Sequence, residues 1–235
     1  MDNRPVVTII GGGLAGSEAA YQAARAGCRA VILEMKPEKL SPAHALPTLC
    51  ELVCSNSLKS MGLENAAGLL KEEMRMAGSV ILDAAQETSV PAGKTLAVDR
   101  KAFSSLVTEK LKAAGVEVVP GEITEVPSAR PLVIATGPLT SDGFASAIQR
   151  LIGKESLHFY DAVAPIVYKE SIDMNKAFMA SRWGNGTDDY INCPFEKGDY
   201  ERFYSALIDA DQVTRREFED AVSFEGCMPI EVMAS

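Results

Sequence analysis

The chain has 235 residues, of which 47% are hydrophobic and 23% are charged, a balance typical of a soluble globular protein with a substantial core. Its net charge is −9: residues 1–120 carry 13 basic and 13 acidic side chains, whereas residues 121–235 carry 10 basic and 19 acidic ones. This acidity does not by itself indicate a nucleic-acid partner. No apolar run is long enough to cross a bilayer, and an odd count of five cysteines without a secretion signal argues against a disulfide framework, so a cytoplasmic location is expected.

The first predicted unit is a strand, a turn, a helix and a second strand. Val6–Ile10 is a short apolar run that is typical of a strand buried on both faces. It leads into a G-x-G-x-x-G set and an alanine-rich helical segment that ends at Gly27. Ala30–Leu33 then forms a second strand with Glu34 at its carboxyl end. This order predicts a Rossmann-like βαβ unit.

Each part of this unit suits dinucleotide binding. The first glycine makes the tight turn, the second admits a pyrophosphate close to the backbone, and the third lets helix and strand pack closely. The amino terminus of the helix offers N–H groups to the phosphates, and the acid suits a ribose hydroxyl. A glycine triplet alone also occurs in ordinary loops, but here every part falls in register. The predicted cofactor-binding residues are Gly11, Gly12, Gly13, Leu14, Ala15, Gly16 and Glu34.

A second informative stretch follows a proline-containing loop over residues 35–47. Cys50 and Cys54 are separated by three residues and have no paired His or Cys nearby, so no metal site is predicted. Cys28 and Cys50 are interpreted as small buried side chains. Cys54 differs because Ser55, Asn56, Ser57 and Lys59 surround it with hydrogen-bond donors.

Residues 68–142 continue the mixed pattern. Helical spacing over 68–82 predicts an apolar face containing Leu69 and Leu70, and a strand and turn follow over 88–98. An amphipathic helix is expected over 101–114, ended by Gly115. Strands are expected over 116–119 and 123–126, paired with one another, and over 132–135. That last strand closes on Ala135, Thr136 and Gly137, an ending found in two-dinucleotide-fold flavoproteins, which favours FAD over NAD by analogy of fold.

The character of the chain changes at Gly143. Short strands, a turn near residues 184–186 and an acidic helix over 199–210 predict an inserted α+β domain. The apolar stripe of that helix contains Phe203, Leu207 and Ile208. Trp183, Tyr190 and Phe195 have the chemistry to stack on bases, although such residues are more often core. The predicted fold class is therefore α/β, with a Rossmann-like FAD-binding domain over 1–142 and an inserted α+β domain over 143–235.

Several strings together resemble the folate- and FAD-dependent tRNA uracil-5-methyltransferase family. The resemblance extends from Val6 to the last residue, and several strings are far more specific than a flavin fingerprint. They are Gly11–Gly16, Leu52–Ser57, Ala135–Ser141, Phe159–Asp161, Ala164–Ile166, Glu170–Met174, Ser181–Arg182, Asp189–Pro194 and Phe224–Ile230.

This resemblance implies an enzyme that methylates carbon 5 of a uridine in the tRNA T-loop. The carbon would come from 5,10-methylenetetrahydrofolate and the electrons from NAD(P)H through FAD. By position, Gly11–Gly16 would hold the FAD pyrophosphate, Glu34 its ribose, and Cys54 and Cys227 would be the two catalytic thiols. A thiolate can add to carbon 6 of uracil and make carbon 5 nucleophilic, which gives such thiols a role.

Members of this family continue well beyond the Cys-Met-Pro-Ile motif, so the chain is expected to be the amino-terminal part of such an enzyme. Three alternatives stay open. They are a flavoprotein that modifies tRNA at another uridine, a generic FAD-dependent oxidoreductase, and a non-catalytic FAD- or RNA-binding fragment. The kind of modification found in tRNA distinguishes the other tRNA-modifying flavoprotein and the oxidoreductase from the favoured function. Whether the purified chain carries flavin tests the non-catalytic fragment.

Overall fold

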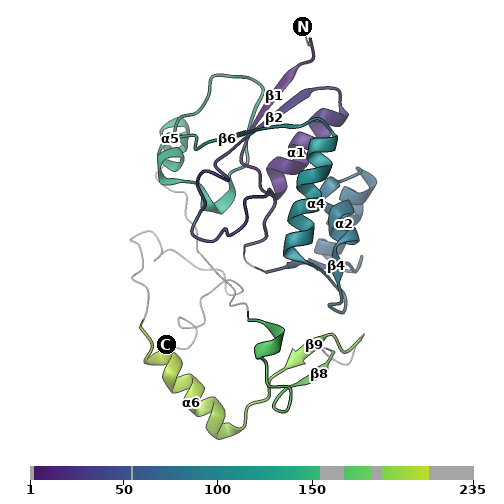
Figure 1. Ribbon diagram of the computed structural model, residues 1–235, viewed down its shortest axis with the longest axis vertical. Coiled ribbons are helices and arrows are strands. Elements are labelled where there is room, and N and C mark those ends of the chain that lie inside the picture. The colour runs from purple at the N-terminus through teal and green to yellow at the C-terminus, as the bar shows by residue number, and fades with distance from the viewer. Residues whose placement is uncertain (1–2, 54, 154–166, 182–186, 212–235) are drawn as a thin grey trace. The chain divides into compact units, whose positions relative to one another are not determined.

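The computed structural model describes residues 3–53, 55–153, 167–181 and 187–211 of the chain (Figure 1). The chain divides into two compact units, Met1–Leu157 and His158–Ser235. Among the described residues, no helix has both the length and the apolar character needed to cross a membrane.

The first unit is built on a four-stranded parallel sheet. Its strands in spatial order are β6 (Glu117–Pro120), β2 (Arg29–Glu34), β1 (Val6–Ile10) and β7 (Leu132–Ile134). Helix α1 (Leu14–Arg25) makes the crossover that joins the parallel strands β1 and β2. Ile10 is in register with Leu33 on one side and Ile134 on the other, so β1, β2 and β7 end together. The predicted Rossmann-like unit is confirmed.

Helices α1 and α4 (Arg100–Ala113) lie side by side against this sheet (Figure 1). Ala20 is small enough to let α1 approach the strands closely, and Phe103 of α4 is fully buried beside it in the same core. The carboxylate of Asp99 caps α4 by accepting a hydrogen bond from the Ala102 N–H at 2.8 Å. Gly115 ends the helix with a φ of +77°, so the bounds predicted from the sequence are confirmed to within one residue.

A smaller antiparallel sheet completes the first unit. Its strand order is β3 (Ser57–Ser60), β5 (Thr95–Val98) and β4 (Ser89–Val90), which confirms the expected strand and turn over 88–98. Helices α2 (Ala66–Met76) and α3 (Val80–Glu87) precede β4 in the chain.

The single helix and apolar face expected over residues 68–82 are wrong in two respects. The segment contains two helices, because Gly78 adopts a φ of +74° and Ser79 caps α3 by accepting from the Leu82 N–H. Leu69 and Leu70 are exposed by 51% and 56%. Gly68 is buried in their place, because its lack of a side chain lets it contact the carbonyl oxygen of Gly62.

The expected pairing of residues 123–126 with the strand before them is also wrong. Residues 123–126 form no strand, and β6 pairs instead with β2 in parallel. Ile123 and Val126 pack against the small cluster formed by Ile10, Phe144 and Ala147. Phe144 and Ala147 belong to α5 (Asp142–Ile152), so this helix packs within the first unit. The boundary predicted at 142/143 would assign most of α5 to the inserted domain instead.

The described part of the second unit contains a short hairpin and a helix. Its elements are η2 (Lys169–Ser171), β8 (Phe178–Ala180), β9 (Tyr190–Asn192) and α6 (Lys197–Ile208). Strands β8 and β9 are antiparallel, and the strand and helix expected here are confirmed. On α6, Phe203 is 44% exposed and stacks on Phe195 with ring centroids 5.4 Å apart, and Ile208 is 42% exposed. Trp183 lies outside the described residues.

Candidate dinucleotide-binding site

A cavity of about 570 Å³ opens at the carboxyl ends of β1, β2 and β7. Its walls come from the glycine loop, the segment after β2, the segment around Cys50 and the turn that follows β7. Ligands of open parallel sheets bind outside the carboxyl ends of the strands, where the strand order reverses. All the predicted cofactor-binding residues except Gly16 line the cavity.

The three glycines of the G-x-G-x-x-G motif have different local constraints. Gly11 has a φ of +98°, and a Cβ atom there would lie 2.6 Å from the carbonyl oxygen of Ala135. A Cβ atom at Gly16 would overlap the carbonyl oxygen of Gly11. A Cβ atom at Gly13 would meet no heavy atom within 4 Å. Gly11 and Gly16 are therefore required by the fold, whereas Gly13 keeps the cavity open.

Gly13 is also the N-cap residue of α1, and no side chain caps this helix end. The first N–H groups of a helix have no partner within the helix, and the helix dipole makes this end positive. No acidic residue occupies the first turn. The end of α1 that faces the cavity therefore suits an anion such as a pyrophosphate.

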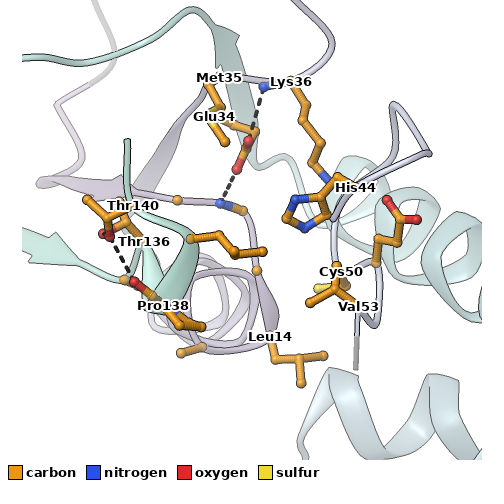
Figure 2. A pocket seen from close by; sticks show the side chains of 18 of the residues that line it. Leu14, Glu34, Met35, Lys36, His44, Cys50, Val53, Thr136, Pro138 and Thr140 are labelled. Atoms are coloured by element: carbon orange, nitrogen blue, oxygen red, sulfur yellow. Dashed lines mark hydrogen bonds between the residues drawn. The ribbon is translucent and has the colours of Figure 1, made fainter. Parts of the chain in front are cut away.

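Glu34 is buried at the end of β2 and is fixed by two backbone groups (Figure 2). Its Oε2 accepts a hydrogen bond from the Gly12 N–H at 2.5 Å, and its Oε1 accepts from the Lys36 N–H at 3.0 Å. A carboxylate oxygen can accept more than one hydrogen bond, so both oxygens keep capacity for a hydroxyl donor. The acid thus ties the glycine loop to the segment after β2.

The turn after β7 forms the opposite wall (Figure 2). Gly137 begins η1 (Gly137–Leu139) with a φ of +64°. The Thr140 hydroxyl donates to the Gly137 carbonyl oxygen at 2.8 Å and lies 2.6 Å from the Thr136 hydroxyl. This segment passes close to the glycine loop, because a Cβ atom at Gly11 would lie 2.6 Å from the Ala135 carbonyl oxygen.

Two basic residues in the proline-containing loop were not identified from the sequence. Lys36 and His44 line the cavity beside Glu34 (Figure 2). Burial lowers the pKa of Lys36, whereas Glu34 and Glu51 oppose that shift, and its ammonium donates to the Thr48 carbonyl oxygen at 2.5 Å. Burial, and next the charge of Lys36, lower the pKa of His44, so a neutral imidazole is favoured.

Glu51 holds this loop in place. Its carboxylate accepts hydrogen bonds from the Ala45 N–H at 3.1 Å and from the Leu46 N–H at 2.9 Å. Irregular loops have no hydrophobic periodicity. Only the density of polar side chains around residues 36–51 could therefore have indicated that this loop forms a wall of the cavity.

Cys50 is buried, as expected, with only 1% of its surface exposed, and burial raises the pKa of its thiol to about 12. The folded state therefore keeps this proton above pH 9, where the unfolded chain loses it. We predict that the free energy of unfolding falls between pH 9 and 12. Cys50→Ala should remove up to about 4 kcal/mol of this fall, because each unit of pKa shift corresponds to about 1.4 kcal/mol. Urea unfolding of both proteins across this pH range measures the difference, and parallel pH profiles would contradict it.

The two predicted catalytic thiols, Cys54 and Cys227, lie outside the described residues, so their roles stay predictions. Val53 and Ser55, which flank Cys54 in sequence, both line the cavity. No group of His, Cys, Asp or Glu side chains suited to a metal ion occurs in the part of the chain that the structure describes.

Comparison with known proteins identifies a family that matches almost the whole chain. The sequence profile of the glucose inhibited division protein A family matches residues 6–235. The methylenetetrahydrofolate–tRNA-(uracil-5-)-methyltransferases TrmFO of Moorella thermoacetica and Geobacter sulfurreducens are 56% and 57% identical over 230 residues. These matches cover 97% of this chain and 53% of each relative, so the chain spans about half the length of the curated relatives it matches.

Similarity to solved structures is weaker. The THI4 protein of Thermovibrio ammonificans is 21% identical, with a TM-score of 0.32 over 51% of this chain and 38% of that chain. CtdE, solved in complex with FAD and a substrate, is 16% identical, with a TM-score of 0.35 over 54% of this chain and 32% of that chain.

Proposed function

The chain belongs to the glucose inhibited division protein A family, and from that premise we propose that it serves as the FAD-binding part of a methylenetetrahydrofolate–tRNA-(uracil-5-)-methyltransferase. The observation that carries the proposal is the identity above 50% to TrmFO proteins over 97% of the chain. The proposed reaction adds a methyl group to carbon 5 of a T-loop uridine in tRNA. The proposed co-substrates are 5,10-methylenetetrahydrofolate and NAD(P)H, and the proposed location is the cytoplasm.

The residues around the cavity fit FAD. The open space at Gly13 and the uncapped amino terminus of α1 suit the pyrophosphate. Glu34 lies at the end of β2, where an acid can accept a hydrogen bond from a ribose hydroxyl. The turn over Ala135–Gly137 closes the opposite side without placing a large side chain against the glycine loop. FAD would supply the transfer of reducing equivalents that turns the donated carbon into a methyl group.

The chain's own residues have four tasks in this proposal. The glycine loop and Glu34 bind and orient the cofactor, and the buried Lys36 and half-buried His44 form one end of its cavity. Cys227 would add to carbon 6 of the target uracil and so make carbon 5 nucleophilic. Cys54 would remove the proton from carbon 5.

The proposal predicts a specific loss from tRNA when the gene for this chain is deleted. Mass spectrometry of digested tRNA should show the T-loop uridine without its 5-methyl group, and re-expression should restore that group. In cells fed serine labelled at its hydroxymethyl carbon, the label should appear in the methyl group, because that carbon enters methylenetetrahydrofolate. A methyl group that persists in the deletion strain would contradict the proposal, and loss of another uridine modification would favour the alternative tRNA-modifying enzyme.

A further inference from the structure

Strand β3 contains a β-bulge at the wall of the cavity. Ser57 pairs with Ala97 and Ser60 with Thr95, so three steps along β3 correspond to two along β5. One extra residue therefore lies between the two pairs, and Lys59 in this interval has a φ of +66°. A bulge of this kind bends the strand and redirects a side chain.

The conformation of Lys59 is unfavourable for a residue with a side chain. A left-handed backbone conformation causes steric strain in any L-residue that has a Cβ atom, so glycine is the usual residue at such a position. Lys59 stands there instead, with its N–H donating to the Ser57 hydroxyl oxygen at 3.1 Å. Strain of this sort is concentrated at functional sites, so the lysine side chain itself needs an explanation.

The surroundings of Lys59 are positive. Its side chain is exposed and lines the cavity near Ser55 and Ser57, and no ion pair joins it to an acidic side chain among the described residues. The neighbouring cation Lys71 donates to the carbonyl oxygens of Ser60 and Ala67. Burial, and then the charge of Lys59, lower the pKa of Lys71. A bound anion beside Lys59 would reduce the repulsion between these two cations.

We propose that Lys59 binds a backbone phosphate of the RNA substrate at the mouth of the cavity. This inference rests on the proposed function for the identity of the substrate. An RNA phosphate is favoured over the pyrophosphate of the cofactor because the uncapped end of α1 already serves the latter, whereas Lys59 reaches solvent. In a chain with a net charge of −9, an unneutralised lysine at the site also gives an approaching polyanion a favourable contact.

The test is the salt dependence of binding to an unmodified tRNA transcript, measured with the full chain. Lys59→Gly should reduce the magnitude of the slope of log affinity against log salt by about one, the value for one lost phosphate contact. Its melting temperature should equal or exceed that of the parent, because glycine relieves the strain. Lys59→Arg should retain the slope. Lys112→Gln, which removes an exposed lysine of α4 that does not line the cavity, should also leave it unchanged.

Each other outcome is decisive. An unchanged slope in Lys59→Gly, or a parent chain that does not bind the transcript, would overturn the inference. Loss of flavin from Lys59→Gly with an unchanged slope would overturn it too and assign Lys59 to the cofactor. If the slope falls as expected while the T-loop uridine keeps its 5-methyl group in the deletion strain, the proposed function fails and the phosphate contact stands.

Discussion

Replacing Gly13 by valine is expected to weaken flavin binding about a hundredfold, or roughly 3 kcal/mol, while the first unit stays folded. A Cβ atom at Gly13 meets nothing within 4 Å, so the protein itself has room for the new side chain. That room is part of the cavity at the amino terminus of α1. A branched side chain there would hold a pyrophosphate away from the N–H groups that bind it.

The other glycines provide matched controls. Gly16→Ala should lower the melting temperature as well as the flavin content, because its Cβ atom would overlap the Gly11 carbonyl oxygen. Gly198→Ala in the first turn of α6 should change neither, since its nearest neighbour is the Arg202 side chain at 3.7 Å. The ratio of flavin to protein absorbance, a flavin titration and a thermal melt measure the three effects. Undiminished flavin in Gly13→Val would show that the loop does not hold the cofactor.

Where local chemistry decides the structure, the sequence predicted it well. The βαβ unit from Val6 to Glu34 follows from apolar runs, glycines and one acid, all within 29 residues. Helix α4 follows from the cap at Asp99 and the left-handed Gly115. The glycine loop lines the cavity, and its role in binding the cofactor stays a prediction.

Where distant segments decide the structure, the sequence was insufficient. Leu69 and Leu70 have the spacing of a buried face, yet the contact of Gly68 with Gly62 turns α2 so that they are exposed. The basic wall formed by Lys36 and His44 depends on an irregular loop that Glu51 fixes through backbone hydrogen bonds. Neither contact has a periodicity that a sequence pattern could reveal.

The second large effect is expected at the two thiols. In tRNA carrying 5-fluorouracil at the target position, a thiolate adds to carbon 6 and carbon 5 accepts the donated carbon. Fluorine cannot then leave carbon 5 as a proton does, so the thiol is not released and a covalent adduct accumulates. We predict that Cys227→Ala abolishes this adduct, with folate, flavin and reductant supplied to the full-length enzyme.

The assignment of the two roles rests on sequence position. Cys54 follows the first βαβ unit, and its neighbours Val53 and Ser55 line the cavity proposed for FAD, so Cys54 is expected beside the cofactor as the base. Cys227 belongs to the region predicted as an inserted domain. Gly226 comes before it and a proline comes two residues after it, a composition that favours a shaped loop over a packed helix.

The two substitutions distinguish the roles in one gel-shift experiment with the fluorinated tRNA. Cys54→Ala is expected to form the carbon 6 adduct but to be inactive on normal tRNA, because the proton at carbon 5 then has no base. Cys28→Ala is the control, since Cys28 does not line the cavity and should leave both readouts unchanged. If the adduct persists in Cys227→Ala and vanishes in Cys54→Ala, the two roles are reversed, because only the thiol that attacks carbon 6 is needed for the bond.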